Sequence, residues 1–347
     1  MRGTFASVYV AWLLGATVVN ATLPHTYCPR CRKVKFHPEV RDGWDIPRSK
    51  CECGADLVRD GHNIPYQIYT DDVRRGNRCG YELGISHALI PQAVQLMKEY
   101  YQDLYSLIQV IRPDRDYEHY TFLLIPCGAD LPKTDDDGIL RMSSEEYWEK
   151  YHDQRTISFI PPNARSVPLR PFTEADLQMC MVPDVFNKVY QKKVEEANKI
   201  LSVNDYRIHN KSILAQAQGC EMTFSLLLQL CGLMHGTSIW EENGEILVKN
   251  GSVDIMDLAA FRDDIILKIQ QSGLLSSCAG QGLAVRIMNE VRRGRYHIKG
   301  MSEEDAHLLE ELGMPNWFIE HIKKIAYAFP KDHTIEFLSR ECIEAAY

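Results

Sequence analysis

The apolar positions of this chain follow helical spacing in most of its long stretches. They predict helices over residues 8–14, 87–111 and 184–201, and mostly helical structure over residues 202–347. A continuous apolar run over residues 120–126 instead predicts a buried strand. The pattern as a whole therefore predicts an α+β fold that is mostly helical.

The second of these predicted helices carries an aromatic stripe formed by Tyr100, Tyr101 and Tyr105. A stripe at helical spacing is more typical of a core face than of a platform on which nucleic-acid bases stack. We therefore expect these rings to be packed inside the protein.

Length and charge bound the class of protein. The 347 residues are enough for two or three domains with real cores. The net charge is −8 at pH 7. This acidic balance excludes a chain-wide nucleic-acid-binding surface but is compatible with a local basic patch.

One basic patch is predicted on a helix near residue 290. Its apolar side is formed by Leu283, Ile287, Met288 and Val291. The cations beside it are Arg286, Arg292, Arg293, Arg295 and Lys299. Arginine can hold two phosphate oxygens at once, so the patch could contact a nucleic-acid backbone. A helix face that is merely solvated would show the same pattern, and the residues alone leave both interpretations open.

Two close cysteine pairs near the N-terminus are the strongest chemical signal. Cys28 and Cys31 are separated by 19 residues from Cys51 and Cys53. Zinc prefers four soft ligands at tetrahedral angles, so the spacing predicts a structural zinc knuckle. A disulfide-bonded secreted segment and a site that no longer binds metal are the alternatives. His62 could add a fifth ligand, although a loop histidine held by neighbouring backbone is the simpler interpretation.

The remaining cysteines are scattered, and several sit in apolar runs, which is typical of reduced thiols in a cytosolic protein. A secretory signal is an alternative, because Arg2 precedes a short apolar run over residues 8–19 and Asn20 begins a glycosylation acceptor. That run is too short to span a bilayer. We expect a cytoplasmic protein with no membrane partner.

The small residues ahead of the first predicted helix form a possible phosphate-binding turn. Backbone N–H groups at a helix N-terminus can bind a phosphate, although most such turns only cap the helix. The candidates in this turn are Arg2, Gly3, Thr4 and Ser7.

Several N-terminal segments occur in an order that resembles a known family. They are residues 2–11, residues 19–25, the first cysteine pair and residues 60–65. Together they resemble the palm segment and zinc insert of the PolC-type DNA polymerase III alpha subunit of low-GC Gram-positive bacteria. That family has an R-G-S-x-G-S-S turn, a V-N-P-L-P-P-H-Y-x-C-P approach, two CxxC pairs and a D-G-H-D-I-P-F exit. The resemblance implies that the N-terminal apolar run is a palm helix rather than a secretion signal.

The resemblance returns in the last third of the chain. Residues 223–240 resemble the family's T-F-S-E-L-V-Q-I-S-G-L-S-H-G-T-D-V-W, residues 262–265 resemble C-R-D-D-I, and residues 287–294 resemble K-I-M-E-S-V-R-K-G. Residues 314–319 and 329–333 follow in family order. In that family this region is the fingers, which close on the template and the incoming nucleotide.

The resemblance favours phosphate contacts by residues of this region. Besides the N-terminal turn, the candidate DNA- and nucleotide-binding residues are His235, Thr237, Arg292, Arg293, Lys331 and His333. Gly236 is expected to supply an unusual backbone angle beside His235. A histidine that only caps the end of a helix is the alternative there. Glu336 weakens the expectation for Lys331 and His333, because its charge would repel a phosphate.

The chain departs from the family where the catalytic strand should follow. The family's exit runs into a strand with P-D-I-D-L-N-F, whose two aspartates hold the catalytic Mg²⁺ ions. Here Asp71 and Asp72 are adjacent, so in a strand they would point to opposite faces, whereas a two-metal site needs converging carboxylates. The later aspartate of L-K-L-D-I-L-G also has no counterpart. Mg²⁺ is thus expected for the family, but its ligands are not found in this sequence.

These observations predict four segments. They are a partial palm-like segment (1–27), a zinc knuckle (28–66), an α/β middle segment of unrecognised type (67–201) and a helical fingers-like domain (202–347). The expected function is that of a fragment or divergent relative of the DNA polymerase, inactive by itself, with primer–template DNA, deoxynucleotide and replication proteins as partners. The alternatives are a non-catalytic zinc-containing interaction protein that acts through its middle segment, and the product of a damaged gene.

Overall fold

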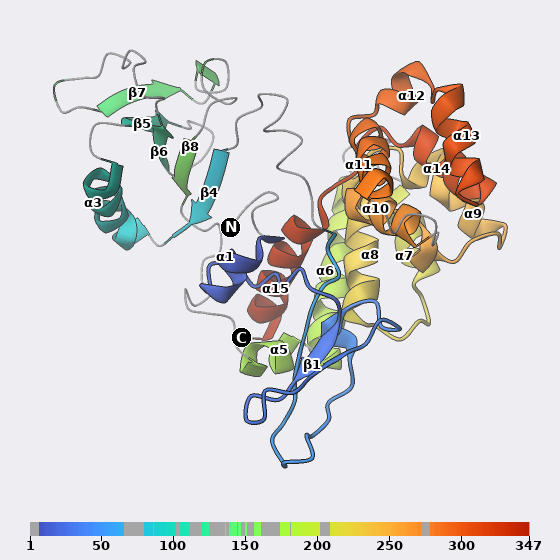
Figure 1. Cartoon of the computed structure of the whole chain (residues 1–347), viewed down its shortest axis with the longest axis horizontal. Helices are drawn as coiled ribbons and strands as arrows, with labels where there is room; N and C mark the ends of the chain where they lie inside the picture. Colours follow the sequence, from blue (N-terminus) through green and yellow to red (C-terminus); the bar gives the residue numbers. More distant parts are fainter. Residues whose placement is uncertain are drawn as a thin grey trace. The chain divides into compact units, whose positions relative to one another are not determined.

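The computed structural model describes residues 7–65, 80–85, 87–101, 105–111, 119–124, 136, 139–143, 145–146, 150, 156–160, 174–180, 182–201, 209–271 and 278–346. The chain divides into two compact units, which are described separately (Figure 1). One comprises residues 1–6 and 67–171, and the other residues 7–66 and 172–347. The described residues confirm the predicted α+β, mostly helical class. The four-segment division remains a prediction. Its segments were defined by resemblance to parts of a polymerase, whereas the two units are defined by how compactly the chain packs.

The smaller unit is built on a five-stranded mixed sheet. Its strands are β4 (Gly80–Gly84), β5 (Tyr105–Ile111), β6 (His119–Leu124), β7 (Ile139–Ser143) and β8 (Thr156–Ile160), in the order β4-β8-β6-β5-β7. The pairs β5–β6 and β6–β8 are antiparallel, whereas β4–β8 and β5–β7 are parallel. A short 3-10 turn (His87–Leu89) leads into helix α3 (Ile90–Tyr101). The helix packs on the sheet through Val94 and Met97, which contact the buried Leu107.

The single long helix predicted over residues 87–111 is wrong. Helix α3 ends at Tyr101, and the apolar residues after it form strand β5 between β6 and β7. Pairing with two neighbouring strands outweighs the helical spacing of those residues. The expected aromatic core stripe is also wrong, since the Tyr100 side chain is 79% exposed and Tyr105 begins the strand.

The larger unit is mostly helical. Its helices are α1 (Tyr9–Leu13), α5 (Glu174–Cys180), α6 (Pro183–Leu201), α7 (His209–Gln216), α8 (Phe224–His235), α9 (Glu245–Lys249), α10 (Arg262–Gln270), α11 (Cys278–Arg292), α12 (Arg295–Lys299), α13 (Glu303–Glu311), α14 (Asn316–Lys324) and α15 (Lys331–Ala346). Short helical turns occur at η2 (Gly43–Asp45), η5 (Trp240–Gly244) and η6 (Ile255–Asp257). In the described part of the chain, none of the helices combines the length and apolar character that crossing a bilayer requires.

Helix α8 is the centre of the larger unit. Thr223 begins it by accepting a hydrogen bond from the Leu226 N–H, and nine of its residues are buried. Gly232 faces the Phe261 ring so closely that a Cβ would lie 2.5 Å from the ring. The helix is therefore apolar on nearly every side because other elements surround it.

The N-terminal apolar run is part of this unit. It forms the short helix α1, and the residues after it are held by side chains from distant elements. The Thr17 hydroxyl donates to the Glu336 carboxylate, and the Asn20 amide donates to Asp60 over 2.9 Å. Asn20 is only 1% exposed, so this fold offers no accessible glycosylation acceptor there.

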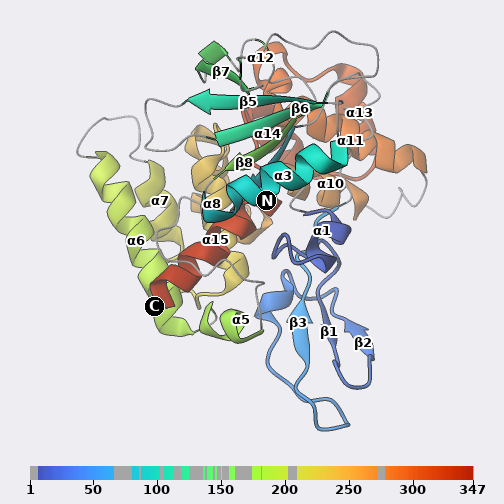
Figure 2. The same cartoon turned by 90° about the vertical axis from the view of Figure 1, so that its left-hand side faces the viewer.

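The knuckle contains a small antiparallel sheet with little core of its own. Strand β1 (His25–Tyr27) lies between β2 (Val34–Phe36) and β3 (Val58–Asp60). In Figure 2 this sheet stands out from the helices of the same unit. Side chains at its base provide the packing, since Trp44 is 2% exposed and lies 4.6 Å from the Phe224 ring and 4.7 Å from the His62 ring.

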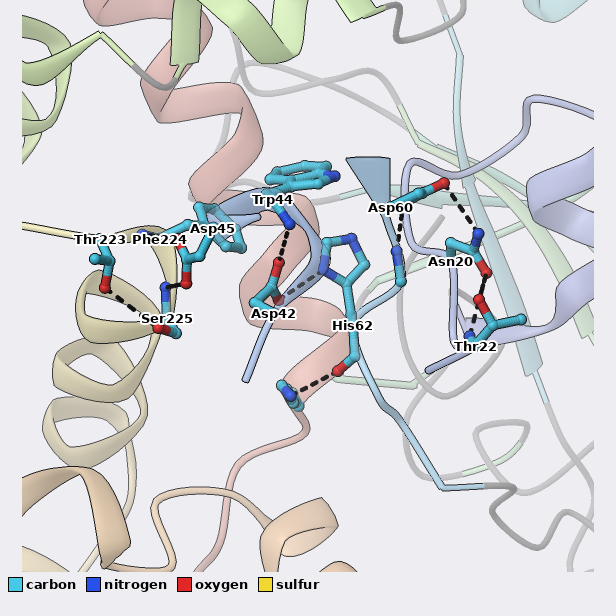
Figure 3. A network of polar contacts seen from close by, with 12 residues as sticks. Asn20, Thr22, Asp42, Trp44, Asp45, Asp60, His62, Thr223, Phe224 and Ser225 are labelled. Atoms are coloured by element: carbon cyan, nitrogen blue, oxygen red, sulfur yellow. Dashed lines mark hydrogen bonds and ion pairs between the residues drawn. The ribbon is translucent and has the colours of Figure 1, made fainter. Parts of the chain in front are cut away.

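Asp45 joins the knuckle to helix α8, as Figure 3 shows. Its carboxylate accepts hydrogen bonds from the N–H groups of Phe224 (2.7 Å) and Ser225 (3.0 Å). These N–H groups have no acceptor within the helix, and the helix dipole favours a negative charge there. Burial raises the pKa of Asp45 to about 6, and the neighbouring Asp42 charge adds to this effect.

The first prediction concerns this contact. Asp45→Ala should lower the free energy of unfolding by about 1 kcal/mol, because two N–H groups at the start of α8 lose their acceptor. Urea unfolding followed by circular dichroism measures the change. Asp56→Ala is the matched control, since the Asp56 side chain lies at the solvated tip of the knuckle and is 84% exposed. Equal unfolding midpoints for the two variants would contradict the capping role.

Candidate metal centre and phosphate-binding residues

Two tight turns at the end of the knuckle bring the four cysteines together. In the first turn the Arg32 N–H donates to the Cys28 carbonyl over 2.8 Å. In the second the Gly54 N–H donates to the Cys51 carbonyl, also over 2.8 Å. Each turn therefore presents its pair of thiols toward the other.

The sulfur positions fit a tetrahedral zinc ion. All four Sγ atoms lie within 4.8 Å of one another, and those of Cys28 and Cys53 are 3.6 Å apart. A zinc ion with Zn–S bonds of about 2.3 Å places its sulfur ligands about 3.8 Å apart. The four residues are free thiols rather than disulfides. The cluster could therefore hold a metal such as zinc.

His62 lies away from this cluster. Its Nδ1 is 2.8 Å from the Asp42 carboxylate, its ring is fully buried, and its backbone N–H donates to the Asn20 carbonyl. This agrees with a held loop histidine. Among the described residues, the four cysteines are the only group found that could ligate a metal.

Hydrogen bonds within the cluster shift the thiol acidities in opposite directions. The Cys31 N–H donates to the Cys28 sulfur over 3.2 Å and lowers the pKa of Cys28 to about 7. The contact with the Cys53 thiol raises the pKa of Cys31 to about 12. A metal binds thiolates, so its binding would release the protons that these groups share.

The structure brings two of the candidate phosphate-binding histidines together. His235 ends helix α8, and its ring stacks on Phe329 with centroids 5.4 Å apart. The His333 ring also lies 5.4 Å from Phe329. Thr237 belongs to the same region, because its backbone N–H donates to the Tyr327 carbonyl over 2.9 Å.

The unusual backbone angle expected at Gly236 is wrong. Its φ is −74°, which any residue can adopt. The glycine is needed for space, since a Cβ there would lie 2.2 Å from Ile239 Cδ1. The left-handed angle falls instead on Ser238, at φ 58°.

Arg292 and Arg293 reach the same neighbourhood from helix α11. Ile287, Met288 and Val291 bury the apolar side of this helix as predicted. The chain then turns at Gly294, which lies against the Ala326 carbonyl. The Ala326 N–H in turn donates to the Thr237 carbonyl over 3.0 Å. The segments that follow α8 and α11 are thus both held against Ala326.

Other cations of the predicted basic patch have acidic partners. Arg286 forms an ion pair with Asp305, and Arg295 forms one with Glu290. These pairs reduce the positive charge that the patch can offer to a phosphate.

Lys331 is placed differently from what phosphate binding requires. It is 8% exposed, and its Nζ donates to the His62 carbonyl over 2.7 Å. Its backbone N–H donates to Asp263. Lys331 therefore connects the C-terminal end of the knuckle, at His62, to the start of α15. Phosphate binding by Lys331 remains a prediction that requires this contact to open.

The N-terminal turn is described only in part. Arg2, Gly3 and Thr4 lie outside the described residues, as do Asp71 and Asp72. Ser7 is described. Burial raises the pKa of Asp332, and a hydrogen bond from the Ser7 hydroxyl to this carboxylate opposes part of that rise.

Sequence reasoning did not select Arg262, which the structure makes a candidate anion-binding residue. It is 7% exposed, and within the described residues its Nε and Nη2 have no hydrogen-bond acceptor. Asp263 Oδ2 lies 3.9 Å from its Nε. Its position in the segment that resembles C-R-D-D-I was the available signal. The two aspartates of that segment have structural roles, because Asp263 accepts from the Lys331 N–H and Asp264 accepts from the N–H of Phe261.

Comparison with known proteins finds relatives of this chain among the bacterial DNA polymerases. They bear the name DNA polymerase III PolC-type. The relative from Clostridium perfringens is 25% identical over 97% of this chain, that from Thermotoga petrophila 26% over 97%, and that from Staphylococcus aureus 24% over 97%. The expected resemblance to part of this polymerase is confirmed. No family model matches the chain.

The chain spans about a quarter of each relative, 27 to 28% of its length. The alignments extend over 402 to 415 positions, more than the 347 residues of this chain, so the relatives carry segments that this chain lacks. With 97% of the chain aligned, the similarity also crosses residues 67–201.

The second prediction concerns the cysteine cluster. The purified protein should contain one zinc ion per chain, and Cys28→Ser should contain much less because one of four soft ligands is lost. Elemental analysis after dialysis measures the content. Cys220→Ser is the matched control, since Cys220 is an exposed thiol outside the cluster. Wild-type protein with well under one zinc per chain would contradict the site.

The third prediction concerns Asp332. Burial raises its pKa to about 7 from an ordinary 3.8, with Asp263 adding to the shift and Arg262 opposing it. The folded state therefore holds this proton more tightly than the unfolded state, and stability from this group falls as the pH rises from about 4 to about 7. Asp332→Asn should lose less stability over this interval than wild type, measured by urea unfolding at several pH values. Identical losses in both proteins would show that Asp332 does not carry this proton.

Proposed function

We propose that this chain is a divergent relative of the PolC-type polymerase that retains DNA- and nucleotide-binding parts but does not extend primers by itself. One observation carries the proposal. The similarity crosses almost the whole chain, yet the sequence contains no counterpart of the paired aspartates on the catalytic strand.

The chemistry explains why those carboxylates matter. Phosphoryl transfer depends on positioning and on metal ions that neutralise charge on the attacking and leaving oxygens. Asp71 and Asp72 are adjacent, and carboxylates on opposite faces of a strand cannot share such a pair of ions.

The proposed role of the cysteine cluster is structural. Cys28, Cys31, Cys51 and Cys53 would hold zinc at the tip of the knuckle. Zinc with four thiolate ligands has no open position for a substrate. The metal would fix the turns, and the base would then keep Asp45 on α8 and the His62 carbonyl on Lys331.

The proposed contacts to DNA and nucleotide lie where α8, α11 and the start of α15 meet. Arg292 and Arg293 would bind phosphate oxygens, with Thr237, His235 and His333 beside them. Arg262 adds a buried guanidinium at the start of α10. Arg286 and Arg295 form ion pairs, and Lys331 donates to the His62 carbonyl, so these three cations are engaged within the protein.

A second candidate function is that of a zinc-containing interaction protein acting through the middle segment. The observation that favours it is the sheet of the smaller unit, in which β4 and β7 are the two edge strands. An edge strand can pair with an extended segment of another protein. A replication protein recovered with the chain, in the absence of DNA binding, would support this function.

The fourth prediction tests activity. With primer–template DNA, deoxynucleotides and Mg²⁺ or Mn²⁺, the protein should incorporate no nucleotide, because it lacks the carboxylates that hold two metal ions. Gel electrophoresis of a labelled primer measures incorporation. Template-dependent extension by this chain alone would contradict the proposal that it does not extend primers.

Binding of the same primer–template measures what the chain retains. We expect affinity that falls steeply with salt, and a further loss of several-fold when Arg292 and Arg293 are both changed to alanine. Lys188→Ala is the control, because Lys188 lies on α6 and its Nζ donates to the Ala345 carbonyl. No binding at low salt would contradict the first function and favour the second.

A further inference from the structure

One face of the knuckle sheet carries an apolar and aromatic surface that is exposed along strand β2. His25 is paired with Phe36 across β1 and β2, and Tyr27 is paired with Val34, so these four side chains share a face. The His25 ring lies 5.8 Å from the Phe36 ring and 6.4 Å from the Tyr27 ring. Phe36 and Val34 are each 54% exposed. The Phe36 ring is therefore exposed to solvent on one side and lies against the His25 ring on the other.

This surface is surrounded by positive charge in an otherwise acidic chain. Residues 25–37 contain four cations and no acidic residue, whereas the whole chain has a net charge of −8. The cations are Arg30, Arg32, Lys33 and Lys35, and all four are exposed.

Two of these four cations have partners within the knuckle. Lys33 pairs with Glu52 over 3.1 Å, and Arg30 donates to the Cys53 carbonyl. Zinc with four thiolates would leave a formal charge of about −2 at the tip, which these two cations offset. Among the described residues, Arg32 and Lys35 have no carboxylate within ion-pair distance. Arg32 lies in the hairpin turn before β2, and Lys35 lies on this edge strand between Val34 and Phe36, where the alternation of side chains directs it to the opposite face of the sheet.

We propose that this face of the knuckle binds single-stranded nucleic acid, with a base stacked on Phe36 beside Tyr27 and the backbone phosphates following the edge of β2, where Arg32 and Lys35 supply the cations. Aromatic rings that stack bases, together with cations that follow the backbone, are the means by which proteins bind single strands without reading sequence. The proposal rests on the DNA-binding function proposed above and assigns it a second surface, separate from the one formed by α8, α11 and α15.

Charge and size favour this occupant over a peptide. A peptide added to β2 would have only three residues to pair with, whereas a base needs only the area of one ring. The same small area limits the face to one or two nucleotides. It would therefore hold a single strand weakly and add to the affinity of the other surface.

The fifth prediction tests this face by fluorescence anisotropy of labelled oligo(dT). Phe36→Ala should weaken binding on the order of tenfold, which is a typical effect of losing one stacked base. The double variant Arg32→Glu, Lys35→Glu should also reduce the slope of log affinity against log salt by about 1, because two phosphate contacts are lost. Each variant is first shown to keep the zinc content and unfolding temperature of wild type.

The matched controls lie outside the knuckle. Ile246→Ala removes an apolar side chain on α9 that is 52% exposed, and Lys98→Glu reverses an exposed charge on α3. Neither should change the affinity for oligo(dT). If the knuckle variants bind oligo(dT) as wild type does, the inference is overturned. Wild-type protein that binds primer–template duplex but not oligo(dT) also overturns it while the proposed function stands, and binding of neither DNA overturns both.

Discussion

The contact between the Asp45 carboxylate and the N-terminus of α8 determines how the larger unit is assembled. The knuckle has too little apolar material for a core, so its fold depends on the contacts of its base with the helices, and a metal at the cysteine cluster would fix its tip. Asp45 supplies the acceptor that Phe224 and Ser225 need, and Trp44 packs on Phe224 directly beside it. One short turn therefore satisfies the start of the central helix and buries the base of the knuckle.

Several groups suited to binding phosphate bind other parts of this protein instead. Lys331 donates to the His62 carbonyl, and Arg286 and Arg295 pair with carboxylates. Arg262 lies close enough to Asp332 for its charge to lower the pKa of that carboxyl, against the larger effect of burial. The Lys331 bond stabilises the junction of the knuckle with α15, whereas the two ion pairs join α11 to α13 and α12.

Features set by interactions within one segment could be predicted from the sequence, whereas features set by contacts between distant segments could not. The helix around Ile287 and Val291 was predictable, because its burial shows as spacing within one segment. Strand β5 was not, since the same apolar residues suit either a helix or a strand until β6 and β7 pair with them. Arg262 lay in a recognised segment, but only the structure shows that its guanidinium is buried beside Asp263.

The sequence by itself determined the four thiols of the knuckle, the mostly helical character of the last third and the adjacency of Asp71 and Asp72. Each of these depends on residue type and local spacing. Only the tertiary structure decided that Asp45 caps α8, that Lys331 fastens the knuckle exit and that Phe36 remains exposed. Those outcomes depend on which distant segments meet, and the free energy of burying a charge or an aromatic ring is set by the partner that it meets.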